Sequence, residues 1–361
     1  MTRIIFTVTN DLNFDQRMQR IAGSLQAEGF SVLLVGRKKK DSAELSATSY
    51  AQKRLPCFFN RGLTFYIEYQ IRLMVFLLFQ KADILCAIDL DTILPVYAVS
   101  VLGKKKRVYD AHELFTEQKE VLSRPGIHRI WKWIEDFAVP RFPLGYTVNE
   151  TIAREFHIRY GVQYAVIRNL PRLTQFPDEK EKKEKWIIYQ GSVNEGRCFE
   201  QLIPAMKQVP AKLVICGEGN FFEQTKALVK ENGLEKKVIF EGYLRPAVLA
   251  QKTQDAYIGI TLFEKDGMNQ YYSLANRFFD YCMAGIPQVC VNYPEYAAIN
   301  ARFQIASLID DTQPDTIALA LNNLLSNDVV YQQLRLKCLK ARLELNWEIE
   351  VQTLIKFYRN L

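Results

Sequence analysis

Acidic side chains and one histidine follow two apolar runs in the first half of the chain. They are Asp89, Asp91, His112 and Glu113. A histidine beside carboxylates can ligate a metal, act as a general base, or be a structural residue with internal partners. A metal is disfavoured because the other two histidines lie in helical patterns away from these runs. We expect His112 to hydrogen-bond a substrate hydroxyl or a developing charge, and a purely structural histidine is the alternative.

A polar loop over 9–13 follows the first apolar run and precedes a helical pattern. Its side chains have two interpretations. Asp11 or Asn13 caps the helix by accepting a hydrogen bond from its first backbone N–H groups. Alternatively, Asn10 and Asp11 contact a ligand, because the N-terminus of a helix favours anions. The chain has no G-x-G-x-x-G sequence, which disfavours a nicotinamide dinucleotide site.

Glycines and an arginine follow the first apolar run of the second half, in the sequence GSVNEGR over 191–197. Glycine lets a backbone approach a ligand closely, here at Gly191 and its neighbour Ser192. Arg197 opens the next helical pattern and has the forked geometry that binds a diphosphate, although an arginine on a surface turn gives the same pattern. Further strand-to-helix turns contain Glu218, Tyr243 and Leu244.

The segment SLANRFFDYCMAGIPQVCV, over 273–291, is the most informative part of the second half. A helix over 274–284 would direct the backbone N–H groups of its first turn toward an anion such as a pyrophosphate. Asp280 lies about one and a half turns into that helix, where its carboxylate can accept both hydroxyls of a ribose. An amphipathic helix that ends at a glycine gives the same pattern without any ligand.

Strand and helix patterns alternate along almost the whole chain. Expected strands cover 4–9, 32–35, 84–88, 107–109, 145–148 and 164–167, and then 186–189, 212–216, 238–240, 257–261, 288–291 and 305–308. Expected helices of the second half cover 197–208, 220–232, 246–253, 274–284 and 314–326, and the tail from 328 is helical. This alternation predicts an α/β fold with parallel sheets covered on both faces. Ligands bind beyond the carboxyl ends of such strands, where the polar residues above lie.

The run PDEKEKKEK interrupts the alternation, and 361 residues suit two domains. We predict a first domain over 1–170, a linker over 171–185, a second domain over 186–345 and a C-terminal helix over 346–361 that crosses back to the first domain. Two Rossmann-like parallel-sheet domains joined in this way would face each other across a cleft that holds the ligand.

Charge and cysteine content limit the environment of the protein. The net charge is +7, and two basic runs contribute to it: Lys38, Lys39 and Lys40, and Lys104, Lys105, Lys106 and Arg107. These runs are either solvated loops or a contact with an anionic membrane surface, and no motif for nucleic acid accompanies them. Seven scattered cysteines without a C-x-x-C pair indicate reduced thiols and a cytoplasmic protein. The N-terminus has no signal-peptide pattern, and the apolar stretch 73–79 is too short to span a bilayer.

Taken in order, several segments resemble the family-4 retaining glycosyltransferases of the GT-B fold, and the resemblance covers nearly the whole chain. The segments are TNDLNFDQRMQRIAGSLQAEGFSV, DLDT, YDAHELF, GSVNEGR, CGEG, FEGY, SLANRFFDYCMAGIP and NWEIE. The resemblance implies sugar transfer from a UDP- or GDP-linked donor to a glycan or lipid-linked acceptor. It also implies a role in surface polysaccharide or glycolipid synthesis, at the inner face of the membrane.

The resemblance assigns roles to individual residues. Arg197 would grip the donor diphosphate, Asp280 would bind the ribose, and His112 would contact the donor sugar. The other donor-side positions are Gly191, Ser192, Glu218, Tyr243, Leu244, Tyr272, Ser273, Leu274, Ala275 and Arg277, and the acceptor-side positions are Asn10, Asp11, Asp89, Asp91 and Glu113. Trp347 and Glu348 lie where the last helix crosses between the domains. No metal or other cofactor is expected, because backbone N–H groups and Arg197 would stabilise the leaving group.

Two positions depart from the family pattern. Tyr272 stands where the family has the first acid of a pair, which binds hydroxyls of the donor sugar, and Glu264 or Asp266 could replace it. Ser192 stands where the family often has an arginine, which leaves Arg197 and Arg277 to neutralise the diphosphate. These departures keep two other functions open, namely a non-catalytic protein that binds sugar nucleotides or a partner, and a GT-B sugar-nucleotide epimerase.

Overall fold

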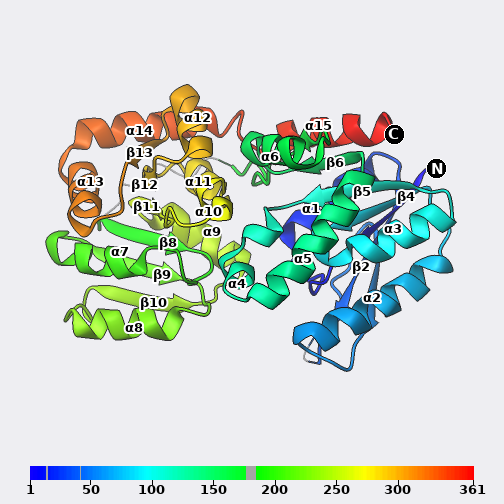
Figure 1. The fold of residues 1–361 in the computed structure, drawn as a ribbon. Helices are drawn as coiled ribbons and strands as arrows, with labels where there is room; N and C mark the ends of the chain where they lie inside the picture. The colour runs from blue at the N-terminus through cyan, green and yellow to red at the C-terminus, as the bar shows by residue number, and fades with distance from the viewer. Residues whose placement is uncertain (14, 41, 176–183) are drawn as a thin grey trace. The chain divides into compact units, whose positions relative to one another are not determined.

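The structure is a computed structural model that describes residues 1–13, 15–40, 42–175 and 184–361. The chain divides into two compact units, one formed by Met1–Asn169 with Glu350–Leu361 and the other by Leu170–Ile349. Each unit contains one parallel sheet with helices on its faces (Figure 1). Most of the expected linker lies outside the described residues, and the expected cleft depends on the placement of the units and stays a prediction.

The first unit has a seven-stranded sheet in the order β3-β2-β1-β4-β5-β6-β7, with parallel pairing throughout. Its strands are β1 (Arg3–Thr7), β2 (Ser31–Lys38), β3 (Ala51–Pro56), β4 (Ile84–Ile88), β5 (Lys106–Ala111), β6 (Leu144–Thr147) and β7 (Ala165–Val166). The central strands β1 and β4 are continuous apolar runs because both of their faces are covered. The sequence patterns predicted every strand except β3, which lies at the sheet edge and buries only Leu55.

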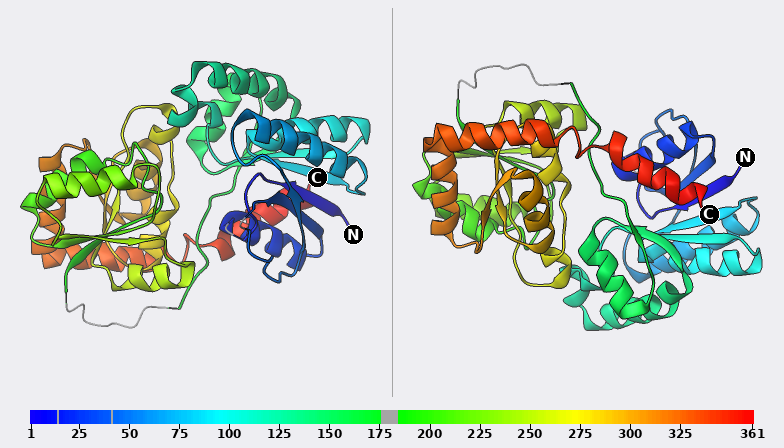
Figure 2. Two further views of the ribbon diagram at one scale, coloured as in Figure 1. Left: turned by 90° about the horizontal axis from the view of Figure 1, so that it is seen from below. Right: turned by 90° about the horizontal axis from the view of Figure 1, so that it is seen from above.

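Helices cover both faces of the first sheet. They are α1 (Gln16–Ala27), α2 (Gly62–Leu78), α3 (Ile93–Leu102), α4 (Lys119–Leu122), α5 (Pro125–Ala138), α6 (Glu150–Tyr160) and α15 (Trp347–Arg359), and 3-10 turns η1 (Leu90–Thr92), η2 (Phe115–Glu117) and η3 (Val139–Arg141) lie between them. Helices α2, α3 and α5 pack side by side on one face, where Tyr66 contacts Trp131 and Tyr97 contacts Phe137. Helices α1 and α15 lie on the opposite face, as both views in Figure 2 show.

The second unit has a six-stranded parallel sheet in the order β10-β9-β8-β11-β12-β13. Its strands are β8 (Trp186–Gln190), β9 (Lys212–Cys216), β10 (Val238–Gly242), β11 (Ile258–Thr261), β12 (Gln288–Val291) and β13 (Ala306–Ile309). Its helices are α7 (Phe199–Ala205), α8 (Phe222–Glu231), α9 (Pro246–Asp255), α10 (Met268–Tyr271), α11 (Asn276–Met283), α12 (Pro294–Phe303), α13 (Pro314–Ser326) and α14 (Asp328–Ala341), with the 3-10 turn η4 (Met206–Gln208) after α7. All six strands were predicted, whereas α10 and α12 were not.

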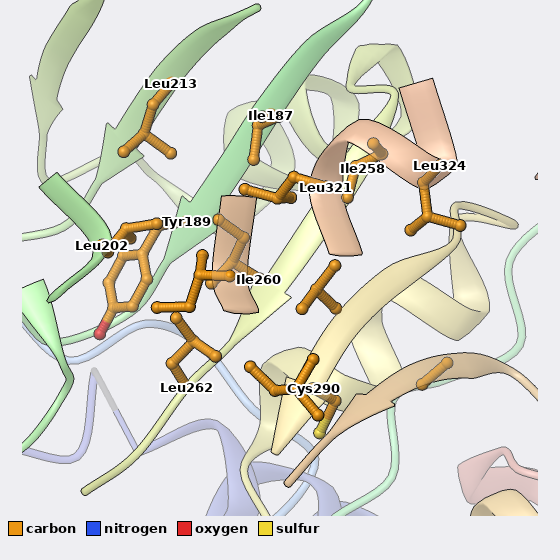
Figure 3. Packing of buried hydrophobic residues seen from close by; sticks show 14 of the residues in the cluster. Ile187, Tyr189, Leu202, Leu213, Ile258, Ile260, Leu262, Cys290, Leu321 and Leu324 are labelled. Atoms are coloured by element: carbon orange, nitrogen blue, oxygen red, sulfur yellow. The ribbon is translucent and has the colours of Figure 1, made fainter. Parts of the chain in front are cut away.

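Alternate residues of β8 pack on opposite faces of the second sheet. Ile187 and Tyr189 belong to the large core under α7 and α13, where Leu202 and Leu321 meet them (Figure 3). Ile188 belongs to a smaller cluster on the other face, next to α9 and α11. Burial on both faces fixes the strand, so the loop that follows Gln190 starts from a rigid position.

Candidate functional site

Two glycine loops of the second unit touch each other beyond the carboxyl ends of β8 and β9. The N–H of Gly191 donates to the carbonyl of Cys216 at 3.0 Å, and the N–H of Val193 donates to that of Glu218 at 3.0 Å. Gly217 has φ +151°, and a Cβ on it would lie 1.9 Å from the carbonyl oxygen of Gly191. Glycine is therefore required where the loops meet.

The side chain of Arg277, in the first turn of α11, is buried beneath these loops. It is 6% exposed, and its guanidinium donates to the Tyr189 hydroxyl at 3.1 Å and to the carbonyl of Leu262 at 3.2 Å. It also lies 3.4 Å from the carbonyl of Gln190, its Nε has no hydrogen-bond acceptor, and no carboxylate among the described residues pairs with it. A buried cation with only neutral partners is costly, so this position favours a bound anion.

Arg197 reaches the same place from the loop after β8. Its guanidinium carbon lies 4.4 Å from the centroid of the Phe263 ring, and that of Arg277 lies 4.7 Å from the same centroid. The loop that carries Arg197 is fixed by the N–H of Glu264, which donates to the carbonyl of Gly196 at 3.0 Å. Two guanidiniums on one ring repel each other unless an anion lies between or beside them.

Asp280 lies one turn after Arg277 and is oriented by the last residue of β8. The side-chain amide of Gln190 donates to the Asp280 carboxylate at 2.9 Å, and its oxygen accepts from the Thr253 hydroxyl at 2.6 Å. Because residues three apart share a helix face, Asp280 and Arg277 point toward the same edge of the sheet. The structure thus brings together Arg197, Arg277, Asp280 and the backbone of Gly191.

The segment before α11 is held by Tyr296, a residue of α12. The N–H of Ala275 donates to the Tyr296 hydroxyl at 3.0 Å, and the Ser273 hydroxyl lies 3.5 Å from it. Helix α11 has no side-chain cap and begins at Asn276, two residues later than predicted. No side chain caps this first turn, and the N–H of Phe278 donates to the carbonyl of Ala275 at 3.1 Å.

Other donor-side positions lie in the turns after β9 and β10 and at the end of α10. Glu218 follows β9, and its carboxylate accepts from the N–H of Tyr243 at 3.4 Å, which joins the turns after β9 and β10. Leu244 packs against the smaller core cluster, and Tyr243 is 58% exposed. Tyr272 ends α10, and its ring lies 5.4 Å from that of Tyr271.

In the first unit, His112 lies between two carboxylates beyond β4 and β5. Its Nδ1 is 3.3 Å from Asp89, its Nε2 is 3.2 Å from Asp110, and its backbone N–H donates to Asp89 at 2.9 Å. Burial alone would lower the pKa of His112, but the charges of Asp89 and Asp110 raise it to about 9. The imidazole is therefore protonated at neutral pH, and both ring nitrogens face internal partners, as the structural alternative requires.

Arg17 holds this cluster from α1. Its guanidinium donates to the fully buried carboxylate of Asp110 at 3.0 Å and to the carbonyl of Ile167 at 3.1 Å. Burial would raise the pKa of Asp110, but the charges of Arg17 and His112 lower it. Burial also raises the pKa of Asp89, against the opposing effect of His112. The four side chains form one buried ionic network at the carboxyl edge of the sheet.

Asp91 differs from Asp89 and Asp110 because it forms no ion pair with a cation among the described residues of the first unit. The Thr9 hydroxyl donates to its carboxylate, and the side chain is 9% exposed. Burial and the nearby charge of Asp89 raise the pKa of Asp91 to about 7. A carboxyl group in this range exchanges a proton near neutral pH, which suits a group that contacts a substrate hydroxyl.

Asp11 is committed to internal partners. Its carboxylate forms an ion pair with Arg54 at 3.3 Å and accepts from Ser42 and from the N–H of Asn13. Burial would raise the pKa of Asp11, but these partners lower it. The expectation that Asp11 or Asn13 caps the first helix is wrong, because Asp15 is the N-cap and accepts from the N–H of Met18 at 3.0 Å.

Two other acceptor-side positions also have internal partners. Asn10 is exposed, and its amide donates to Asp15 at 3.2 Å. Glu113 accepts from the side chain of Gln118 at 2.5 Å. Sequence reasoning missed Arg17 and Gln190 and gave no separate role to Asp110 in the YDAHELF segment. A charged or amide residue at a strand end or in a helix gives no signal of the partner that it meets.

The described residues contain neither a metal-binding cluster nor a membrane-spanning helix. No group of three or more histidine, cysteine, aspartate or glutamate side chains there has an arrangement that could hold a metal ion. None of the helices in these ranges has both the length and the apolar character needed to cross a bilayer. All seven cysteines are described, and none forms a disulfide.

Residues 172–341 match the model of a protein family described as glycosyl transferases group 1. Solved structures with the same fold include sucrose-phosphate synthase of Thermosynechococcus elongatus, with a TM-score of 0.82 at 14% identity over 100% of this chain and 99% of that chain. Anabaena Alr3699/HepE in complex with UDP-glucose has a TM-score of 0.76 at 11% identity over 100% of both chains. WaaG, a glycosyltransferase involved in lipopolysaccharide biosynthesis, has a TM-score of 0.74 at 15% identity over 96% of this chain and 98% of that chain.

These likenesses concern the fold. Identities of 11–15% over whole chains show that two Rossmann-like α/β domains are arranged in sequence as in the GT-B proteins, which confirms the expected fold class. No curated protein matched the sequence. The family match lies in the second unit, which contains Arg197, Arg277 and Asp280.

Proposed function

We propose that the protein transfers a sugar from a nucleoside diphosphate sugar, linked to UDP or GDP, to a glycan or lipid-linked acceptor. The observation that carries this proposal is the buried guanidinium of Arg277, which has only neutral partners and shares the Phe263 ring with Arg197. A donor diphosphate would give the Arg277 guanidinium an anionic partner in addition to its neutral ones. The family match over 172–341 and the fold shared with a UDP-glucose complex support the same ligand class.

The site suits chemistry in which a diphosphate leaves. As the bond between sugar and phosphate lengthens, negative charge develops on the phosphate oxygen, and a preorganised cationic site stabilises it. Arg197, Arg277 and the first-turn N–H groups of α11 supply that environment without a dedicated metal. Asp280, held by Gln190, orients the nucleotide through its ribose hydroxyls. In this reading Tyr243 and Leu244 hold the base and Ser273, Leu274 and Ala275 support the phosphates.

We propose retention of the anomeric configuration, which rests on the resemblance to family-4 enzymes. In that mechanism the departing phosphate oxygen accepts the proton of the acceptor hydroxyl on the same face of the sugar. No protein nucleophile is then required. His112 contributes a fixed positive charge near the donor sugar, because its ring nitrogens lie 3.2 and 3.3 Å from carboxylate oxygens. Asn10, Asp89, Asp91 and Glu113 lie on the acceptor side.

Glu264 is our candidate for the function of the acid that Tyr272 replaces. It follows β11, and its backbone is bonded to Gly196 one residue before Arg197. Asp266 lies further along the same loop and is exposed. If Glu264 binds hydroxyls of the donor sugar, Glu264→Gln reduces sugar transfer while UDP affinity stays unchanged, whereas Asp266→Asn changes neither.

One observation favours a second candidate function. Without the first acid of the family pair, the chain could bind a nucleotide sugar and lack transferase activity, and an epimerase of the same fold would bind the same ligand. A melting-temperature screen against nucleotide sugars identifies the donor, because a ligand that binds the native state raises the melting temperature. Incubation of the donor with an acceptor extract, followed by NMR of the products, then separates the three functions. A new glycoside with the donor's anomeric configuration supports our proposal, an altered sugar on the nucleotide supports the epimerase, and an unchanged donor supports the binding protein.

A further inference from the structure

Helix α2 is apolar on two opposite faces. Its buried face consists of Phe65, Tyr69, Leu73 and Leu77, which pack toward the sheet. A second set, Leu63, Ile67, Ile71 and Val75, has the same spacing of four residues but is 47% to 54% exposed. The two sets are offset by two residues, which is about 200° around a helix, so they lie on opposite sides.

Aromatic residues extend the exposed face at both ends of α2. Phe58 precedes the helix and is 83% exposed, and Phe79 follows it and is 82% exposed. The two charged residues of α2, Glu68 and Arg72, pair with each other at 2.8 Å. The exposed face therefore carries no net charge, and exposed apolar groups in this number mark a surface that binds a partner or a membrane.

Lysines lie at both ends of this apolar face. At the C-terminal end, Lys81 is exposed, and the Lys105 ammonium donates to the carbonyl of Gln80 at 2.8 Å, which brings the run of three lysines from 104 to 106 against the end of α2. Lys104 and Lys106 are exposed there, directly after the exposed side chain of Leu102 in α3.

At the N-terminal end, Arg37 links the other basic run to α2. Its guanidinium donates to the carbonyl of Asn60 at 2.7 Å and lies 3.8 Å from the centroid of the Phe65 ring. Arg37 is buried, whereas Lys38, Lys39 and Lys40 directly after it are exposed. The two basic runs noted in the sequence thus flank one apolar helix face.

We propose that the exposed face of α2 is the site at which the protein binds an anionic lipid bilayer. The face would enter the boundary between headgroups and acyl chains, with Phe58 and Phe79 inserted and the lysines at each end on lipid phosphates. The length of α2 fits this orientation, because 17 residues span about 25 Å, less than the hydrocarbon core, and its inner face is already packed on the sheet. The inference stands without the proposed transferase activity.

The charges around the exposed face of α2 favour a bilayer over a second protein as its partner. A second copy of the chain or another protein could cover an apolar face. The exposed lysines at both ends, however, would repel a second copy of the same surface. An anionic bilayer can bury the apolar face and attract the flanking lysines with its phosphates, and it is flat over the length of the helix.

Vesicle sedimentation with the full chain tests the proposal. The wild-type protein should bind phosphatidylcholine vesicles that contain phosphatidylglycerol and bind pure phosphatidylcholine weakly. The double variant Ile67→Glu, Ile71→Glu should lower the partition coefficient about tenfold or more. The matched control, Leu319→Glu with Leu336→Glu, changes two exposed leucines of the second unit and should bind as the wild type does.

Charge is tested separately. Lys104→Glu with Lys106→Glu should reduce binding to the anionic vesicles about tenfold or more, whereas Lys230→Glu with Lys236→Glu, at exposed lysines of the second unit, should not. UDP affinity should be unchanged in all four variants, which separates failure of this inference from failure of the proposed function.

The result that overturns the proposal is equal binding by the wild type and the Ile67, Ile71 variant, or no binding of the wild type to anionic vesicles. Dimerisation of the wild type in light scattering, lost in the isoleucine variant and without vesicle binding, would assign the face to self-association instead. A second measurement does not depend on the folding of the glutamate variants. Phe79→Trp changes an exposed side chain, and brominated lipids should quench the fluorescence added by the new tryptophan.

Discussion

The guanidinium groups of Arg197 and Arg277 lie against the same ring, at 4.4 and 4.7 Å from the centroid of Phe263. One comes from the loop after β8 and the other from the first turn of α11, 80 positions later by their residue numbers. The hydrogen-bond partners of the Arg277 guanidinium are a neutral hydroxyl and neutral carbonyls, so a bound anion would stabilise this cation. The following predictions depend on this convergence or on the ionic network of the first unit.

Replacement of either arginine should weaken binding of the donor. Arg277→Met and Arg197→Met each remove a charge-assisted contact with the diphosphate, worth about 1.5–3 kcal/mol, or about 10- to 150-fold in the dissociation constant of UDP. Isothermal calorimetry measures this directly. Arg302→Met is the control, because Arg302 is 70% exposed and forms a surface ion pair with Glu344, which contributes little. Unchanged UDP affinity in both site variants would refute the diphosphate assignment.

Sequence patterns were sufficient for the strands that are buried on both faces. Strands β4, β9 and β12 were predicted with the bounds that they have, because continuous apolar runs occur only where both sheet faces are covered. The edge strand β3, with the sequence AQKRLP, was missed because it buries a single side chain and reads as a loop. The interior strands of a sheet, and with them the fold class, can therefore be predicted from the sequence, whereas an edge strand such as β3 cannot.

The candidate site was predictable in its loops and not in its contacts. Arg197 stands out because it follows a glycine loop, and Asp280 because of its place in the expected helix over 274–284; both lie beyond the carboxyl end of β8. Arg277 was expected only as a second cation for the diphosphate, and its burial against Tyr189 was not predicted. The ring nitrogens of His112 were expected to face a substrate, but Asp110, a residue inside the preceding strand, lies on one of them.

Replacement of Asp280 should weaken binding of the nucleoside part of the donor and leave binding of the diphosphate unchanged. Asp280→Asn keeps the size of the side chain but removes the charge that accepts two ribose hydroxyls, so UDP should bind about 10-fold or more weakly. Pyrophosphate has no ribose, and its binding to the same variant should match that of the wild type. Calorimetry with both ligands checks the assignment, and an equal loss for UDP and pyrophosphate would mean that Asp280 acts on Arg277 and not on the ribose.

Gly217 should be required for the contact between the two glycine loops. In Gly217→Ala the new Cβ would meet the carbonyl oxygen of Gly191 at 1.9 Å, so the loops must separate, and the free energy of unfolding should fall by about 2 kcal/mol or more. UDP affinity should fall with it. Gly233→Ala is the matched control, since Gly233 also has positive φ, +67°, but has nothing within 4 Å of a Cβ. It should lose about 1 kcal/mol of stability and keep full UDP affinity.

The network around His112 should make stability depend on pH in the alkaline range. The pKa of His112 is raised from 6.5 in the unfolded chain to about 9 in the folded protein, so the folded state binds the proton more tightly. The stabilisation is complete below pH 6.5 and is lost as the pH rises through about 9, and a shift of this size corresponds to about 3 kcal/mol.

Urea unfolding from pH 6.5 to about pH 10 should therefore show a steeper loss in the free energy of unfolding for the wild type than for His112→Gln. His157→Gln, at an exposed histidine of α6, should follow the wild-type curve, because groups other than His112 titrate equally in both proteins. Parallel curves for the wild type and His112→Gln would show that the two carboxylates do not hold a proton on His112, and the fixed positive charge assigned to it would have to be abandoned.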